Sequence, residues 1–214
     1  MTADVRAAGG TEAAVGRTPA RLAEAPAGRT TGWWGMVLFI CTESATFAAF
    51  LASYYYLRFS ADGTWPPDHE KLPSLLVPSV GTAVLIVSCL PMWLCGRAAR
   101  VRAGARRLFW LVLTLLGGVC FFVLQILDWR AEWPASTLSK DTYGSLFYSI
   151  TGLHTVHVVL GLLMLLLLLG QALVRRLGPQ RQTGSIRVVA LYWYFLAAVA
   201  VPVYVTAYLA PYWI

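Results

Sequence analysis

The stretch that decides the fold is YGSLFYSITGLHTVHVVLGLLMLLLLLGQAL, residues 143–173, which contains no Asp, Glu, Lys or Arg. A helix needs about 20 apolar residues to cross a hydrocarbon core of about 30 Å, so this stretch is long enough to span a bilayer. Four further apolar stretches exceed or approach this length, at about 33–58, 74–95, 108–128 and 188–212. The sequence therefore predicts an all-α membrane protein, a bundle of five transmembrane helices.

The composition excludes a soluble domain. Hydrophobic residues make up 58% of the 214 residues and charged residues only 13%, and the mean hydropathy is +0.63. A soluble chain of this length has too little interior to bury that much apolar surface. The predicted organisation is a tail at residues 1–32 followed by one membrane domain at residues 33–214, with no separate soluble domain.

The basic residues predict the orientation of the bundle. The tail and the links after the second and fourth stretches together hold thirteen of the 17 Lys and Arg residues, and with five spans they all fall on one side of the membrane. The positive-inside rule places that side, and the N-terminus, in the cytoplasm and the C-terminus outside. The tail is rich in Ala, Gly, Thr, Pro and Arg, which predicts a disordered cytoplasmic segment.

Glu43 is the only acid deep inside a predicted span. It lies ten residues into the first stretch, about 15 Å along a helix, which is near the middle of the bilayer. A charged carboxylate there costs at least about 2.5–3.5 kcal/mol, so Glu43 must be protonated, paired, or facing protein or water. It is either a protonated acid that hydrogen-bonds a neighbouring helix or a residue that handles protons, and we favour the second.

His154 and His157 lie three residues apart in the fourth span, so both project from one side of that helix. Thr151 and Gly161 fall near the same face, which leaves it small enough for a close helix approach. A metal site would need further ligands, and no suitable third ligand is evident. We therefore favour a buried imidazole pair that hydrogen-bonds another helix, and Glu43, at similar depth, is the natural partner.

Two other sets of residues need an interpretation. Gln125 and Asp128 close the third span, where polar residues either mark a helix end or join a polar network. The four cysteines all lie inside apolar runs and show no C-x-x-C spacing, which favours small buried hydrophobic residues over disulfides or metal ligands; they are Cys41, Cys89, Cys95 and Cys120.

Four segments resemble one family, subunit III of the haem–copper oxidases (cytochrome c and quinol oxidases). WWGMVLFICTESATFAAFLASYYYLR (33–58) resembles the helix that carries the family's intramembrane acid. GSLFYSITGLHTVHVVLG (144–161) is similar to its G-S-x-F-x-x-x-T-G-x-H-x-x-H-V-x-x-G signature, and QILDW (125–129) to its Q-x-x-E-Y/W motif. LYWYFLAAVAVPVYVTAYL (191–209) is similar to its last helix. Five spans match the short bacterial form, which implies a multi-pass protein of the bacterial cell membrane.

The resemblance implies a subunit without redox centres, cofactor sites or catalytic residues of its own. Such a subunit packs against catalytic subunit I, in a complex with subunit II, and the partner subunits hold the haem and copper. Members sustain proton uptake, protect the catalytic subunit during turnover and bind phospholipid. Glu43 falls on the family's carboxylate-reactive acid, and His154 and His157 on its paired histidines. Gln125, Asp128, Thr151 and Tyr194 are secondary polar candidates.

Two departures from the family pattern keep alternatives open. The last helix of the family reads W-H-F-V-D, whereas here Tyr194 and Ala197 stand where the histidine and aspartate are expected. In the Q-x-x-E-Y/W motif, Asp128 replaces the glutamate. The leading hypothesis is an accessory subunit of a cytochrome c oxidase that reduces oxygen to water. The alternatives are subunit III of a quinol oxidase, a similar partner of nitric oxide reductase, and a free-standing transporter or proton channel that uses Glu43.

Overall fold

The computed structural model describes residues 31–61, 65, 73–101, 103–132, 142–174 and 179–213. The predicted cytoplasmic tail lies outside these residues except for its last two positions, which begin the first helix. The elements, in chain order, are α1 (Thr31–Ser60), α2 (Leu76–Val87), α3 (Cys89–Arg100), α4 (Gly104–Glu132), α5 (Thr142–Leu173), α6 (Pro179–Tyr204), a π-helix η1 (Val205–Leu209) and α7 (Ala210–Trp213).

Among the residues that the structure describes, five helical segments are long and apolar enough to cross a membrane, which confirms the predicted five-helix membrane bundle. Several helices extend beyond the apolar stretches predicted for them. The second stretch, predicted to end at residue 95, continues to Arg100, and the third begins at Gly104 instead of residue 108. Polar and basic residues at a membrane surface continue a helix as readily as apolar ones. Hydropathy alone therefore underestimates the length of these helices.

The second span consists of two helices, α2 and α3, that meet at Ser88. Pro91 lies inside this span, in the first turn of α3, and the helix runs on to Arg100. Proline has no N–H, so it cannot bond the carbonyl of Val87, four residues earlier. The Ser88 Oγ donates to the Leu85 carbonyl at 2.6 Å at the junction. The span is therefore interrupted only locally, at Ser88, whose backbone stays helical and still donates to the Val84 carbonyl.

The last span also departs from a regular α-helix. Pro202 lies inside α6, and three residues later the chain forms the π-helix η1. A π turn changes the direction of the side chains that follow it, and such turns are frequent at functional positions. Thr206, Ala207 and Tyr208 within η1 are all buried, so this short segment presents three consecutive side chains to the interior.

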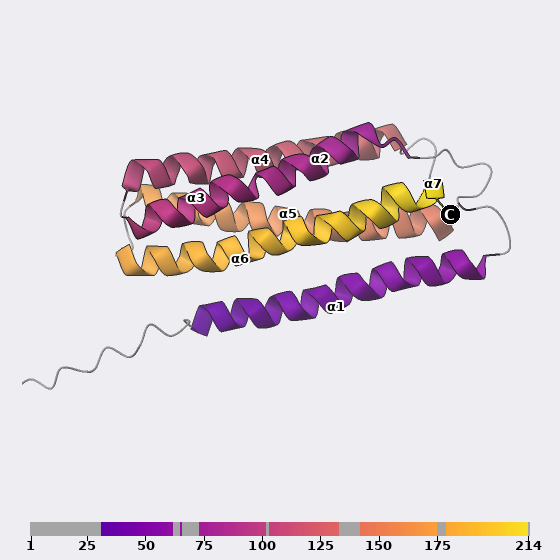
Figure 1. Ribbon diagram of the computed structural model, residues 1–214, viewed down its shortest axis with the longest axis horizontal. Helices are drawn as coiled ribbons and strands as arrows, with labels where there is room; N and C mark the ends of the chain where they lie inside the picture. Colours follow the sequence, from indigo (N-terminus) through magenta and orange to yellow (C-terminus); the bar gives the residue numbers. More distant parts are fainter. Residues whose placement is uncertain are drawn as a thin grey trace, which may run out of the picture.

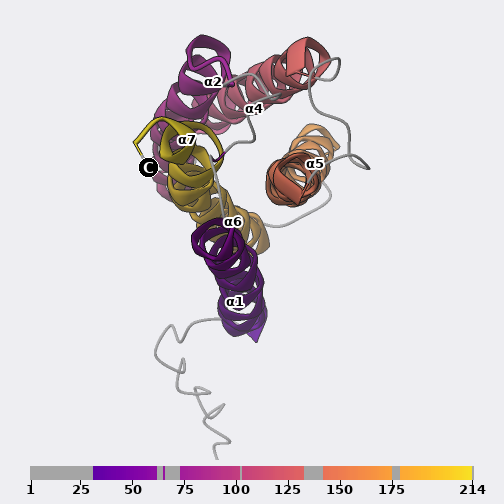
Figure 2. The ribbon, with the colours of Figure 1, turned by 90° about the vertical axis from the view of Figure 1, so that its right-hand side faces the viewer.

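The five spans lie side by side along the long axis of the molecule (Figure 1). Seen from one end, α6 occupies the middle, with α2, α3 and α4 on one side of it, α5 on another, and α1 at the outer edge (Figure 2). α1 packs against α6 and α5. Only 6% of its membrane-spanning window is buried, against 28–39% for the other four spans. α1 is therefore an outlying helix beside a four-span core.

Close helix contacts in the core depend on glycines. A Cβ added to Gly118 of α4 would lie 2.5 Å from the Trp193 ring and 2.7 Å from Leu162, and one added to Gly161 of α5 would lie 2.8 Å from Leu196. Gly118 therefore leaves room on α4 for the Trp193 ring of α6 and for Leu162 of α5, and Gly161 lets α5 approach α6. A larger residue would collide at either position. The prediction that Gly161 permits a close helix approach is confirmed.

The prediction that all four cysteines are buried is wrong for two of them. Cys95 is buried and Cys89 is partly buried, but Cys41 of α1 and Cys120 of α4 are exposed. All four are free thiols. A span that faces lipid or a partner subunit is apolar on its outside as well as its inside, so an apolar run does not indicate which face points inward.

Candidate functional site

Glu43 of α1 and His157 of α5 meet where these two helices pack together, at the edge of the four-span core. The Glu43 Oε2 lies 2.8 Å from the His157 Nε2, and their side chains are 22% and 9% exposed. The contact predicted between Glu43 and one of the two histidines is therefore present, and the histidine is His157. This hydrogen bond joins the outlying helix α1 to α5 of the core.

The second ring nitrogen of His157 indicates how protons are distributed in this contact. Nδ1 lies 2.8 Å from the carbonyl oxygen of Leu153, one turn earlier in α5. A carbonyl oxygen only accepts hydrogen bonds, so Nδ1 carries a proton and donates it. The Nε2–Oε2 contact then holds one proton, either on Glu43 as a neutral pair or on His157 as an ion pair. In both cases Glu43 and His157 share a single proton.

Neighbouring residues fix the position of His157. The Phe47 ring of α1 lies 5.1 Å from the imidazole in an edge-to-face arrangement. The Tyr192 hydroxyl of α6 donates to the backbone carbonyl of His157 at 3.1 Å. Three spans, α1, α5 and α6, therefore meet at this residue. Tyr192 was not among the predicted site residues, since its bond to a backbone carbonyl has no sequence signal.

His154 has a different environment from His157. It is 2% exposed, and neither ring nitrogen has a hydrogen-bond partner among the described residues. Its ring packs edge-to-face on Phe121 of α4 at 5.7 Å and lies 6.2 Å from Phe47. The two histidines therefore do not act as one pair: His157 contacts the acid, whereas His154 fills an aromatic site in the core.

A second polar cluster lies where α4 meets η1. The Gln125 Nε2 donates to the Tyr208 hydroxyl at 3.3 Å, and that hydroxyl donates to Asp128 Oδ2 at 2.5 Å. All three residues are buried. Gln125 and Asp128 therefore join an interhelical network instead of only marking a helix end. Tyr208 was missed at the sequence level because its inward direction depends on the π turn.

The remaining secondary candidates are divided between this region and a different surface. Thr151 of α5 accepts from the Trp129 Nε1 of α4 at 3.2 Å and donates to the Phe147 carbonyl at 2.7 Å, so it joins α4 to α5. Tyr194 is exposed and lines a pocket with residues of α3. The structure thus places Tyr194 apart from the Glu43–His157 pair.

Trp193, which follows the buried Tyr192, forms another contact that the sequence analysis did not identify. It is fully buried, and its Nε1 donates to the Ser88 Oγ at 2.9 Å. The bond reaches the junction between α2 and α3 from the centre of α6. A tryptophan in an apolar run does not indicate which hydroxyl it will contact, because that partner lies 105 residues away in the chain.

Within the described residues, no three His, Cys, Asp or Glu side chains lie close enough to hold a metal ion. His69 lies outside these residues. That the chain itself binds neither haem nor copper stays a prediction.

Comparison with known proteins identifies the family. The sequence profile described as cytochrome c oxidase subunit III matches residues 25–213. The "Probable cytochrome c oxidase subunit 3" of Nocardia farcinica is 33% identical over 81% of this chain and 85% of its own, and that of Mycobacterium leprae is 34% identical over the same shares. The "Cytochrome c oxidase subunit 3" of Synechocystis is 32% identical over 82% of this chain and 74% of its own. With its five spans and its match over nearly the whole membrane domain, this chain belongs to the cytochrome c oxidase subunit III family.

Proposed function

We propose that this chain is a non-redox accessory subunit of a terminal haem–copper respiratory oxidase, in which it stabilises catalytic subunit I and supports its proton uptake. Family membership supports the assignment to an oxidase complex. The observation that carries the proton-related part is the shared-proton contact between Glu43 and His157. An acid kept inside a membrane span at an energetic cost has a functional role by default.

In this proposal the Glu43–His157 pair is neutral at rest. Burial disfavours two separate charges, and an ion pair would gain little over its cost of desolvation. A neutral carboxyl that donates to Nε2 satisfies both groups without a buried charge. Because Glu43 keeps 22% of its side chain exposed, it lies at the edge of the bundle, where it can exchange a proton with a partner subunit.

The outlying helix α1 is the surface we assign to the partner subunits I and II. Much of α1 is exposed although the helix is apolar, and its exposed side chains include Leu38, Tyr56 and Phe59. In a complex, this surface would lie against another membrane subunit or lipid. Haem and copper belong to the partner subunits in this proposal, and this chain contributes no ligand to them.

We also propose that the protein is a multi-pass component of a bacterial cell membrane with its N-terminus in the cytoplasm. The starts of α4 and α6 and the end of α3 carry Arg residues, and such loops stay on the cytoplasmic side. A cysteine introduced at residue 102 should resist a membrane-impermeant thiol reagent in intact cells. Labelling at residue 102 from outside would overturn this orientation.

Purification of the tagged chain from its native membrane in mild detergent tests the proposed function. We expect haem absorbance and an oxidase subunit I to co-elute with the chain, and pure chain alone to show no haem band. A CuA-containing subunit II among the co-eluting proteins indicates a cytochrome c oxidase, and its absence a quinol oxidase. Co-elution with a nitric oxide reductase, or elution of a haem-free chain that conducts protons in vesicles, would contradict the proposal.

A further inference from the structure

His154 of α5 is a buried titratable side chain that the proposed function does not use. It is 2% exposed, and neither of its ring nitrogens has a hydrogen-bond partner among the described residues. A neutral imidazole carries a proton on one nitrogen and a lone pair on the other. Buried polar groups are nearly always hydrogen-bonded, so an imidazole with two unpaired nitrogens needs a physical explanation.

The surroundings of His154 are aromatic. The Phe121 ring of α4 lies 5.7 Å from the imidazole and the Phe47 ring of α1 lies 6.2 Å from it, both edge-to-face. The hydroxyl groups of Thr151 and Thr155, three residues before it and one after it in α5, already donate to backbone carbonyls. A hydrogen-bond partner for His154 must therefore come from another element of the bundle.

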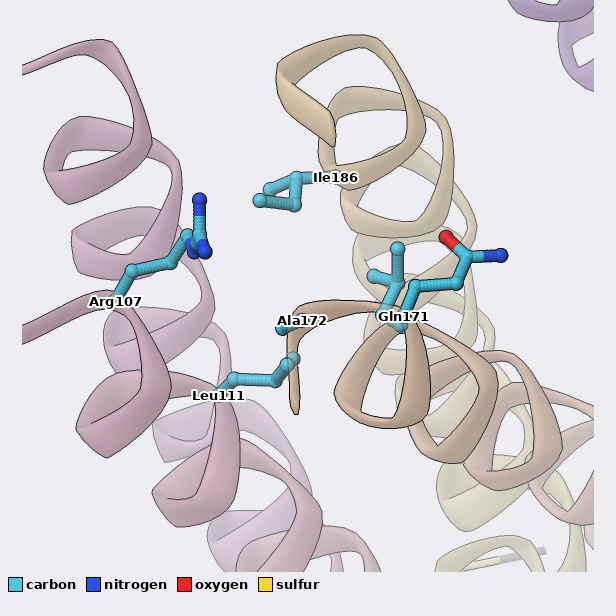
Figure 3. Close-up of a pocket in the computed structure, with 6 residues that line it drawn as sticks. Arg107, Leu111, Gln171, Ala172 and Ile186 are labelled. Carbon is cyan, nitrogen blue, oxygen red and sulfur yellow. The ribbon is translucent and has the colours of Figure 1, made fainter. Parts of the chain in front are cut away.

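Arg107 shows how a polar side chain between these helices can be satisfied without a second protein partner. It extends into a small pocket among α4, α5 and α6, toward Ile186 (Figure 3). The free volume of this pocket is about 10 Å³, roughly enough for one water molecule. Arg107 is only partly buried, so its guanidinium group can be hydrated there. His154 is more deeply buried and has phenyl rings on two sides.

Glu43 lies about one helical turn from His154. α1 and α5 run in opposite directions (Figure 1), so the turn from Glu43 to Phe47 leads toward the same end of the bundle as the step from His157 back to His154. That step of three residues covers about 4.5 Å along the helix axis. The Phe47 ring contacts both imidazoles, at 5.1 Å from His157 and 6.2 Å from His154, so it borders the space between the two histidines.

The Glu43 carboxyl group can move over this distance. The side chain has three rotatable bonds, and rotation about them displaces the carboxyl group without a backbone shift. The side chain is also 22% exposed, so it is not enclosed on all sides. α1 is the least buried of the five spans, and a movement of this helix disturbs little packing. The buried Phe47 ring is the obstacle that remains.

We infer that His154 is a second binding position for the Glu43 carboxyl group and that the Phe47 ring is the gate between the two positions. In the neutral pair the carboxyl O–H donates to the His157 Nε2. In the second position the same O–H donates to the lone pair of the His154 ring. The proton stays on the carboxyl oxygen throughout and is carried toward the C-terminal end of α1. This inference rests on the neutral pair of the proposed function and adds a carrier step to it.

Infrared spectroscopy of the full-length chain in detergent tests the second position, because the C=O stretch of a neutral carboxyl group depends on its hydrogen bond. The Glu43 band is identified by its loss in Glu43→Gln. We expect His157→Leu to move this band to a new position. Adding His154→Leu to that variant should move the band again, to the position of a carboxyl group without an imidazole partner. A band that the second substitution leaves unchanged would overturn the inference.

The gate is tested in the same spectra. Phe47→Leu should shift part of the Glu43 band toward the position seen in His157→Leu, because a smaller side chain opens the way to His154. Phe59→Leu is the matched control, since it makes the same change at an exposed position of α1, and it should leave the band unchanged. Identical spectra for Phe47→Leu and Phe59→Leu would overturn the role of Phe47 as a gate.

Unfolding temperatures give an independent readout, with His157→Phe as the second variant should His157→Leu not fold. Glu43→Ala should lower the unfolding temperature in the starting protein, less so in His157→Leu, and not at all in His154→Leu/His157→Leu. No loss in His157→Leu, or an undiminished loss in the variant that lacks both imidazoles, would overturn the second position. The absence of any neutral carboxyl band in the starting protein would contradict the neutral pair of the proposed function, and the unfolding temperatures would still decide whether His154 is a partner of Glu43.

Discussion

Two regions of this molecule are held together in different ways. α4, α5 and α6 pack through glycines, so that Gly118 and Gly161 lie directly against Trp193 and Leu196. α1 has no such contact: a Cβ added to Gly32 or Gly35 would meet nothing within 4 Å.

α1 is joined to the rest of the bundle by polar contacts along its length. Glu43 shares a proton with His157 at 2.8 Å, the Tyr55 hydroxyl lies 3.3 Å from the Thr206 Oγ1, and the Arg58 guanidinium donates to the Ala210 carbonyl at 3.4 Å. Within a membrane there is no hydrophobic drive between helices, so either close packing or hydrogen bonds must supply the association. The core uses both, since the Trp193 Nε1 also donates to the Ser88 Oγ within it, whereas α1 has interhelical hydrogen bonds but no glycine in close contact with another helix.

The largest effect should come from overfilling the core. Gly118→Leu would force a side chain into the space of Trp193 and Leu162 and should destabilise the chain by more than about 3 kcal/mol, because added methylenes in a packed core cost about 1–3 kcal/mol and this change adds several. Thermal unfolding of the purified chain in detergent measures this loss of stability.

Gly35→Leu on α1 is the control for that variant, since it adds the same side chain to an unoccupied position. It should leave the unfolding temperature nearly unchanged. If Gly118→Leu proved as stable as Gly35→Leu, the close packing of Trp193 and Leu162 against Gly118 would be wrong.

A smaller effect is expected for the polar tie of α1. Glu43→Ala leaves the His157 Nε2 without its partner and should cost about 1–3 kcal/mol, seen as looser retention of the subunit by the oxidase and a lower unfolding temperature. Glu43→Gln should keep the subunit assembled, because the amide can still donate to Nε2. It should also abolish modification by a hydrophobic carbodiimide. Equal loss of assembly in both variants would contradict a hydrogen-bonding role.

The smallest effect is expected at the outer end of α1. Tyr55→Phe removes the hydroxyl that contacts Thr206 and keeps the ring, which should cost about 0.6 kcal/mol, the average for a hydrogen bond between membrane helices. The change in unfolding free energy measures it. A loss as large as that of Glu43→Ala would mean that α1 is held at its end instead of its middle.

Part of this structure could be predicted from the sequence because the signals are local. The five spans follow from hydropathy over about 20 residues, and Glu43 is conspicuous as an acid inside one of them. The choice between His154 and His157 was not predictable, since it depends on how α1 and α5 are rotated against each other.

Contacts made by shifted or distant groups could not be predicted either. Tyr208 reaches Asp128 from a π turn, and no composition or spacing rule announces one. The exposed thiols of Cys41 and Cys120 were mistaken for buried ones because a helix that faces lipid is apolar all round. In such a chain the sequence therefore predicts the helices and the polar residues inside them. It does not predict how each helix is rotated about its own axis.

The central claim is that one shared proton between Glu43 and His157 ties α1 to the core, and a double-mutant cycle tests it most directly. The unfolding free energies of the starting protein, Glu43→Ala, His157→Ala and the double variant give the coupling between the two side chains. We predict a favourable coupling of about 0.6–1.7 kcal/mol, the range for hydrogen bonds between membrane helices. Additive effects of the two substitutions, with no coupling, would contradict the claim.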